Sequence, residues 1–243
     1  MDFSLTPKQR EVVELARAIA QEEIKVASLI IDKNGIVPDS LMNILKQSGM
    51  TQLAIPKEYG GAGLDILTVA MVAEQLAMGC AGIATICAAN ALATFPVLQA
   101  GNEEQKNIWC NCLNEGGMAA FALTEPGAGS DAGAVSCQAK KMDDGYLISG
   151  NKSFITNGPI ADKIALFANT RQEGGIRGLT LFMVDAKAKG VSIGKKEDKM
   201  GIRASSTSEI IFEDCFVPDS QRIGREGRGF KIAMQTLQTS RPV

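Results

Sequence analysis

The chain has 243 residues, with 25 Lys and Arg against 27 Asp and Glu, which gives a net charge of −2. This balance, with a pI of about 5.4, argues against nucleic-acid binding, because such proteins usually carry a basic stripe. Histidine is absent, which removes the commonest general base, the Ser-His-Asp arrangement and most zinc or iron sites. Chemistry in this chain must therefore use carboxylates, a cofactor or a partner, and no metal site is expected.

The six cysteines form no C-x-x-C pair, and reduced thiols in a cytosolic protein are the simplest explanation. A redox pair at Cys110 and Cys112 is the less favoured alternative. The N-terminus shows no basic region followed by an apolar run, so no secretory signal is predicted. We expect a cytoplasmic protein, or one of the mitochondrial matrix if the source is eukaryotic.

The first 118 residues predict an all-helical domain. Four of its helices are predicted from caps or stops at their ends. The first starts at Pro7, with Thr6 as N-cap and Gln9 closing a capping box. The second runs from near Pro38 to Gln47, with Gly49 as its stop. The third runs from residue 66 to about 78 and is capped by Asp65, and the fourth is capped by Asn102 and runs to about Asn114.

Residues 75–102 carry no charge, which raises the possibility of a membrane helix. The segment is rich in Ala and Gly, contains Pro96, and lacks flanking Lys/Arg asymmetry and aromatic anchors. A buried helix is therefore the favoured prediction, and no membrane partner is expected.

From Ala119 the pattern changes to that of a β domain. A turn at residues 143–145 (Asp-Asp-Gly) between two extended runs predicts a hairpin. Further strands are expected at residues 163–169, 180–185 and 207–214. After a glycine-rich linker at 224–229, apolar residues recur at helical spacing from Phe230, and the chain stops within this helix.

Two loop segments in the second half carry candidate chemistry. Residues 121–134 read FALTEPGAGSDAGA, and residues 154–158 read FITNG. Because glycine permits the φ values and the close approach that a phosphate needs, the first loop can turn several backbone N–H groups toward one anion. For Gly-Ala-Gly-Ser alone, an ordinary tight turn is the commoner explanation.

The same glycines, at residues 127–132, also fit the G-x-G-x-x-A spacing of a dinucleotide-binding βαβ unit. That interpretation requires a helix directly after the glycines. The sequence predicts a hairpin there instead, which argues against a Rossmann fold.

Taken whole, residues 122–134 resemble the first signature segment of the acyl-CoA dehydrogenase flavoproteins. Three more segments resemble this family at the expected places: IPKEYGGAGLD at 55–65, FITNG at 154–158, and the run from 197 to 242. The resemblance extends from the first residues to Val243, and the run at 195–213 is most similar to the short-chain, butyryl-type members.

The resemblance implies an α+β fold in three parts. They are an N-terminal all-helical domain (residues 1–118), a middle β-sheet or barrel domain (119–226) and the start of a C-terminal helical bundle (227–243). Family members continue into a C-terminal four-helix domain, so we expect this chain to be a fragment or an interrupted gene product. Members are commonly homotetramers, which predicts a homo-oligomer for the full-length form.

The resemblance also assigns site residues. The expected FAD contacts are Phe121, Leu123, Thr124, Gly129, Ser130, Phe154, Ile155 and Thr156, with the Thr156 hydroxyl at the flavin N5. The expected acyl-CoA contacts are Ser130, Gln238, Thr239, Ser240 and Arg241. The family usually has Tyr and Trp where Phe121 and Phe154 stand; without the resemblance, core packing explains both rings equally well.

The implied reaction is α,β-dehydrogenation of an acyl-CoA, of short chain by similarity, to the trans-2-enoyl-CoA, with electrons passed to electron-transferring flavoprotein. A carboxylate takes the α-proton while hydride leaves the β-carbon for the flavin. In most of the family this base lies beyond the position of Val243, and in a minority at the position of Ser240. Because Ser240 is not a carboxylate, we expect the chain alone to turn over acyl-CoA slowly or not at all.

Two alternatives stay open: another superfamily member such as an acyl-CoA oxidase, and a non-catalytic flavin- or acyl-CoA-binding fragment or interaction module. Glu125 lies inside the first motif and is interpreted as a loop-ordering residue, because the family does not use it as the base. Lys195, Lys196 and Lys199 could meet CoA phosphates, although a solvated charge run is favoured.

Overall fold

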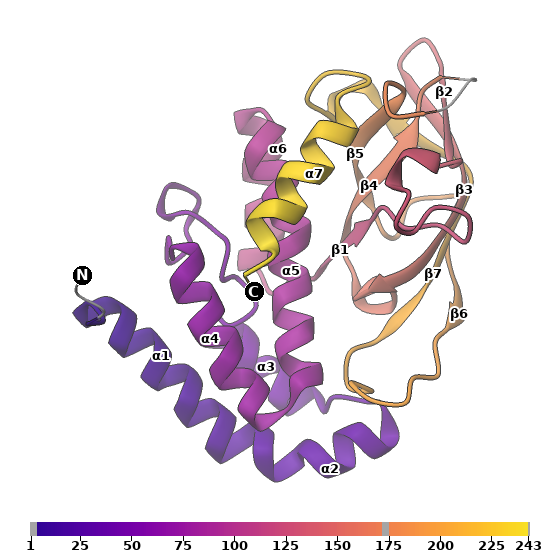
Figure 1. Ribbon diagram of the computed structural model, residues 1–243. Coiled ribbons are helices and arrows are strands. Elements are labelled where there is room, and N and C mark those ends of the chain that lie inside the picture. Colours follow the sequence, from indigo (N-terminus) through magenta and orange to yellow (C-terminus); the bar gives the residue numbers. More distant parts are fainter. Residues whose placement is uncertain (1–3, 172–174, 243) are drawn as a thin grey trace.

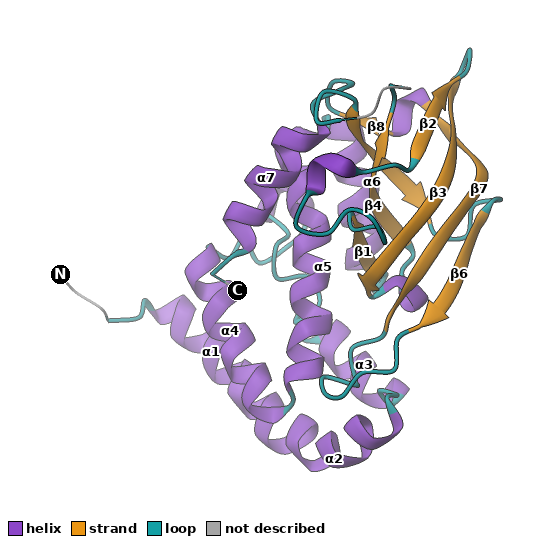
Figure 2. Ribbon diagram, turned by 45° about the vertical axis from the view of Figure 1, so that its right-hand side comes forward, coloured by secondary structure: helices purple, strands orange, loops and turns teal. Residues whose placement is uncertain are grey.

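The structure is a computed structural model that describes residues 4–171 and 175–242 (Figure 1). A helical N-terminal part and a mixed β-sheet lie side by side, and a C-terminal helix runs along their junction (Figures 1 and 2). The predicted fold class is confirmed. Val243, the last residue of the predicted third part, lies outside the described residues.

Helix α1 (Pro7–Ile19) begins at the predicted capping box, in which the Thr6 side chain accepts from the Gln9 N–H and the Gln9 side chain accepts from the Thr6 N–H. It continues through a π-helical turn (Ala20–Ile24) into α2 (Lys25–Asn34), which ends at Gly35 with φ 65°. The sequence did not predict α2. Its apolar side chains Val26, Leu29 and Ile30 are exposed, so the apolar residues of this segment do not mark a single buried helix face.

The other helices of the first half were also predicted, all but α5 with a cap or stop at one end. They are α3 (Asp39–Gln47), α4 (Ile66–Gly79), α5 (Ala81–Ala100) and α6 (Glu103–Asn114). The Asp65 carboxylate accepts from the Thr68 N–H at 2.7 Å, and the Asn102 side chain accepts from the Gln105 N–H at 2.9 Å. Both predicted N-caps are confirmed.

Helix α5 joins two apolar cores. Its residues Ile83 and Ile86 pack into the core of the helical part, whereas Ala93 and Val97 pack into the core that includes the sheet. By length and composition α5 could cross a membrane, but 67% of its apolar window is buried inside the protein. A helix that is apolar all round and covered by protein is the expected core helix.

The strands form one mixed sheet with the order β6-β7-β3-β2-β4-β5-β8, and β1 pairs with β4 in parallel. Their bounds are β1 (Ala119–Ala122), β2 (Gln138–Lys141), β3 (Gly145–Thr156), β4 (Lys163–Asn169), β5 (Leu179–Asp185), β6 (Val191–Lys196), β7 (Thr207–Pro218) and β8 (Arg222–Ile223). The predicted hairpin is the antiparallel β2–β3 pair. Strands β6 and β8 were missed because one is largely polar and the other has two residues.

Helix α7 (Gly229–Ser240) crosses from the sheet to the helical part. It packs on α5 and β5 through Ile232, Ala233 and Thr236, which are buried. At Gly229 a Cβ atom would lie 2.8 Å from the Leu179 carbonyl, so only glycine permits this close approach. The junction of α5, α7 and the sheet is thereby fixed.

Candidate functional site

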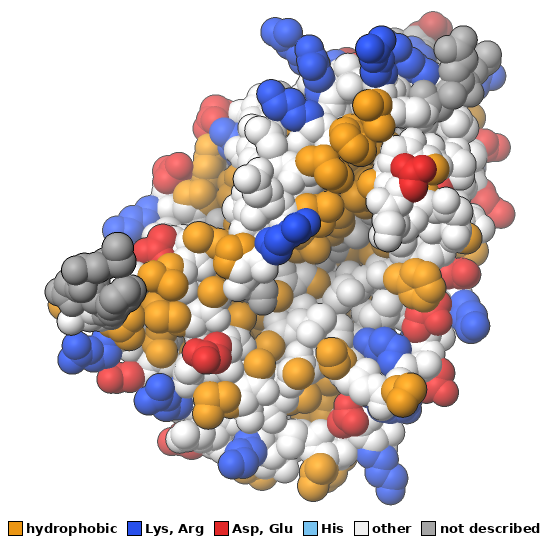
Figure 3. Space-filling model, in the orientation of Figure 1, with side chains coloured by type: hydrophobic (Ala, Val, Ile, Leu, Met, Phe, Trp, Pro, Cys, Tyr) orange, Lys and Arg blue, Asp and Glu red, His pale blue; other side chains and the backbone are white. Residues whose placement is uncertain are grey.

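A cleft of about 550 Å³ opens where the sheet meets α5 and α7. Its walls come from the loop after β1, the end of β3, Ala89 and Leu92 of α5, and one side of α7. Apolar side chains gather along this junction on the molecular surface (Figure 3). The cleft is therefore built from both halves of the chain.

The first wall is the loop that follows β1. Glu125 and Ala128 exchange backbone hydrogen bonds of 3.1 Å, which closes a tight turn. The turn presents Gly127 and Gly129 to the outside, where an added Cβ atom would meet nothing within 4 Å. Internal packing thus does not require these glycines, and the open side of the loop is left for a ligand.

After the glycines the chain forms a short 3-10 turn (Ala132–Ala134) and then β2, so the Rossmann alternative is wrong.

Glu125 lies beneath this loop with 3% exposure. Its carboxylate accepts from the Ser136 N–H and hydroxyl at 2.7 and 2.6 Å, and from the Cys137 N–H at 3.0 Å. It also forms a 2.7 Å ion pair with Lys152. These contacts agree with the interpretation of Glu125 as a loop-ordering residue, which stays a prediction.

Burial by itself would raise the pKa of Glu125, but the neighbouring Lys152 charge and the hydrogen bonds from Lys152 and Ser136 hold that pKa below its ordinary value. Burial lowers the pKa of Lys152, and the Glu125 charge opposes that shift. The carboxylate is therefore ionised at neutral pH.

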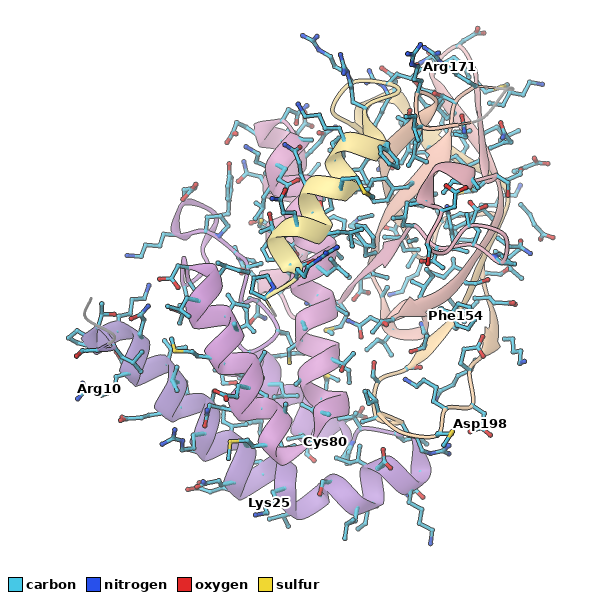
Figure 4. All side chains as sticks on the ribbon, viewed as in Figure 1. Arg10, Lys25, Cys80, Phe154, Arg171 and Asp198 are labelled. Atoms are coloured by element: carbon cyan, nitrogen blue, oxygen red, sulfur yellow. The ribbon has the colours of Figure 1, made fainter. Side chains whose placement is uncertain are left out.

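The second wall is the end of β3, where the pairing with β7 is irregular between Lys152 and Ile155. Phe154 has φ 58° and is 63% exposed at the cleft (Figure 4). A bulky residue in the left-handed region is an outlier that marks a constrained site. For Phe154, the core-packing alternative is wrong.

Asn157 holds the same segment from behind. It is fully buried with φ 63°, and its side-chain N–H₂ donates to the carbonyls of Ile86 and Ala119 at 3.0 and 3.3 Å. These bonds join the segment to α5 and β1.

Phe121 differs from Phe154, because it both lines the cleft and packs on Phe167, with ring centroids 5.1 Å apart.

Three residues with hydroxyl groups line the cleft from the two walls, Thr124, Ser130 and Thr156. Across residues 4–171 and 175–242, none of these hydroxyls, and neither the Gly129 nor the Ser130 backbone N–H, has a hydrogen-bond partner in the protein. Unsatisfied polar groups that border a largely apolar cleft are what an oriented polar ligand needs.

Of the four substrate contacts expected at residues 238–241, on and directly after the end of α7, the structure brings one to the cleft. Arg241 lines it together with Leu237, whereas Gln238, Thr239 and Ser240 are not among the lining side chains. The Thr239 hydroxyl donates to the Gln235 carbonyl and the Ser240 hydroxyl to the Leu237 carbonyl. Their assignment to acyl-CoA stays a prediction.

Other candidates lie away from the cleft. Lys199 donates to the Ser205 carbonyl and to the Thr207 hydroxyl, and Lys196 donates to the Gly35 carbonyl. None of the three lysines Lys195, Lys196 and Lys199 lines the cleft. All six cysteines are free, and burial raises the pKa of Cys110 to about 11, which disfavours a reactive thiolate. No cluster of three or more metal-ligating side chains occurs among the described residues.

Lys152 and Asn157 were missed as site residues from the sequence. One signal for Lys152 was available, because it lies in phase with the buried Tyr146 and Ile148 on the same strand. A lysine on an inward-facing position is almost never buried unless it is paired. No sequence signal pairs it with a carboxylate 27 positions earlier.

Comparison with known proteins identifies the two halves. Residues 6–117 match the family model for the acyl-CoA dehydrogenase N-terminal domain, and residues 120–215 match that for the acyl-CoA dehydrogenase middle domain. The chain is 42% identical over 243 residues to the short-chain specific acyl-CoA dehydrogenase of Clostridium acetobutylicum, covering 99% of this chain and 64% of that protein.

Solved structures agree. The butyryl-CoA dehydrogenase of Megasphaera elsdenii superposes with a TM-score of 0.94 at 39% identity, covering 99% of this chain and 64% of that one. An acyl-CoA dehydrogenase from Bacillus anthracis, complexed with FAD, superposes with a TM-score of 0.88 at 30% identity, covering 98% of this chain and 42% of that one. The chain thus spans about two thirds or less of the length of the proteins it matches.

Proposed function

Since the chain belongs to the acyl-CoA dehydrogenase family, we propose that its cleft binds FAD and serves the dehydrogenation of a short-chain acyl-CoA. One observation carries the proposal. All eight residues expected to contact FAD line this single cleft, although they come from segments about 30 positions apart. The open glycine loop and the unpartnered hydroxyl and N–H groups fit a cofactor that carries phosphates and a polar ring.

In this proposal the protein binds and orients, while FAD, when bound, supplies the acceptor for the hydride from the substrate. The Gly129 and Ser130 N–H groups would hold an anionic part of the cofactor, and the Thr156 hydroxyl would bond to the ring. Phe121 and Phe154 would pack on it as apolar walls. Arg241 is the one cation that lines the cleft among residues 4–171 and 175–242.

The substrate, base and partners are proposed on the family alone. The only carboxylate that lines the cleft among the described residues is Asp131, and it accepts from the N–H of Gly133 in its own loop at 3.1 Å. We therefore propose that the described residues bind the cofactor but do not provide the family's base. The trans-2-enoyl-CoA product, electron-transferring flavoprotein as acceptor and a homo-oligomeric full-length form complete the proposal.

The test is the visible absorption spectrum of the purified chain after incubation with FAD, followed by anaerobic addition of butyryl-CoA. A bound flavin that stays oxidised supports a cofactor site without the base. Bleaching would contradict the proposed lack of the base, and rapid reoxidation of bleached flavin in air would favour an oxidase. Absence of bound flavin would overturn the proposed cofactor site.

A matched pair of substitutions sharpens this test. Gly129→Val should abolish the bound flavin spectrum without changing the melting temperature, because a side chain there enters open space in the cleft. Gly201→Val, at another open glycine outside the cleft, should change neither property.

A further inference from the structure

We infer that the buried Glu125–Lys152 pair is a positioning device that holds residues 123–130 in the shape that the cleft needs. Its connection to flavin rests on the proposed function. Neither side chain lines the cleft, so both act through the backbone that does.

Lys152 contacts two groups of the loop at once. Its ammonium donates to the Glu125 carboxylate at 2.7 Å and to the Leu123 carbonyl at 3.0 Å. The next residue of β3, Ser153, donates its N–H to the Thr124 carbonyl at 2.9 Å. Three successive loop residues are therefore anchored to two successive residues of β3.

Glu125 extends this anchor to a third segment. Both of its carboxylate oxygens are used, one by Lys152 and the Cys137 N–H, and the other by the N–H and hydroxyl of Ser136. The loop is thus tied to β3 on one side and to the start of β2 on the other. The Leu123 and Thr124 carbonyls accept bonds from β3, whereas the Gly129 and Ser130 N–H groups have no partner among the described residues.

The burial of the pair distinguishes it from the other ion pairs among the described residues. The Lys152 and Glu125 side chains are 0% and 2% exposed, whereas every other pair has one partner that is at least 48% exposed. A buried ion pair gives little net stability compared with apolar residues of similar volume. An apolar pair could fill the same space but could not bind the Leu123 carbonyl and three donors from residues 136 and 137. The geometry therefore assigns the pair to the shape of the loop.

The test compares the double variant Glu125→Gln/Lys152→Met with the wild-type chain. Removing both charges together avoids an unpaired buried charge, so the melting temperature should stay within about 5 °C of the wild type. Hydrogen exchange of the amides of residues 125 and 128, which close the turn, should quicken about tenfold, and the FAD dissociation constant should rise about tenfold, because the bonds that order the loop are lost. A purely structural role would instead move the melting temperature and leave local exchange unchanged.

The exposed pair Glu103–Lys106 provides the matched control. Its double variant Glu103→Gln/Lys106→Met should leave loop exchange and FAD affinity at wild-type values. Unchanged exchange at residues 125 and 128 in the Glu125→Gln/Lys152→Met variant would overturn the inference. If the wild type binds no FAD, the proposed function fails, while the exchange measurement still decides the inference.

Ser136→Ala covers the case in which the double variant does not fold. It removes one hydroxyl bond to Glu125 from an exposed residue and should quicken exchange of the same loop roughly threefold. No change in that loop would count against the positioning role.

Discussion

The two walls of the cleft are held in place by opposite means. Residues 123–130 are anchored by a buried pair of charges, Glu125 and Lys152. The segment from Phe154 to Asn157 has left-handed backbone at both of these residues and is held by neutral amide bonds from Asn157. One ligand site can thus depend on two different anchors, one sensitive to charge and one to backbone conformation.

The largest effect should come from breaking only half of the charged anchor. Lys152→Met leaves Glu125 as an unpaired buried carboxylate and should lower the free energy of unfolding by about 3–5 kcal/mol. Urea unfolding measures this loss. Lys187→Met removes a lysine that is 83% exposed from an ion pair and should leave stability nearly unchanged. Similar behaviour of the two variants would mean that burial of the pair has no energetic consequence.

The neutral anchor should break in a different way. Asn157→Ala loses two buried hydrogen bonds and forces alanine into φ 63°, and together these should cost about 2–4 kcal/mol. Asn157→Gly loses the same bonds without the left-handed penalty, so it should be about 1 kcal/mol more stable than the alanine variant despite its greater chain entropy. Urea unfolding of both variants decides this. Equal stability would show that backbone conformation contributes nothing here.

The sequence predicts what is decided locally. Thr6, Asp65 and Asn102 cap the helices they were expected to cap, because a cap and its partner lie three residues apart. The strand at residues 163–169 was predicted with its observed bounds from its own β-branched and aromatic composition. The α+β fold followed from these elements and from the family resemblance.

What the sequence could not predict depends on distant partners. The charged anchor joins residues 27 positions apart, and Asn157 bonds to a carbonyl 71 positions earlier. The left-handed conformation of Phe154 is invisible in the sequence, because a bulky aromatic residue normally avoids it. Likewise, Leu92 of α5 and Met234 of α7 reach the cleft only once the two cores have packed on each other.

Lowering the pH should weaken the charged anchor but not the neutral anchor. The pKa of Glu125 is lower in the folded protein than its ordinary value of 4.5, so the unfolded chain binds more protons as the pH falls through this range. The stability that Glu125 provides is present above 4.5 and is lost as the pH falls through the folded pKa.

Urea unfolding at a series of pH values tests this dependence. The wild type should lose more of its unfolding free energy below pH 4.5 than Glu125→Gln/Lys152→Met does. Asn157→Gly, which alters only the neutral anchor, should follow the wild-type profile. A double variant as acid-sensitive as the wild type would assign the acid response to other carboxylates.

The smallest change in stability is expected at Phe154. Phe154→Gly should relieve about 1–2 kcal/mol of left-handed strain, whereas the extra backbone entropy of glycine in the unfolded chain should cost about 0.5–1 kcal/mol. The free energy of unfolding should therefore change by less than about 1 kcal/mol. Phe216→Gly is the matched control, since Phe216 is 49% exposed on β7 and has no positive φ. Because there is no left-handed strain to remove at this position, the Phe216→Gly variant should be destabilised by about 1 kcal/mol. FAD affinity should fall only in the Phe154 variant, because Phe154 lines the cleft and Phe216 does not. Equal destabilisation of the two variants would mean that Phe154 adopts its conformation without strain, and the second anchor would then reduce to the amide bonds of Asn157.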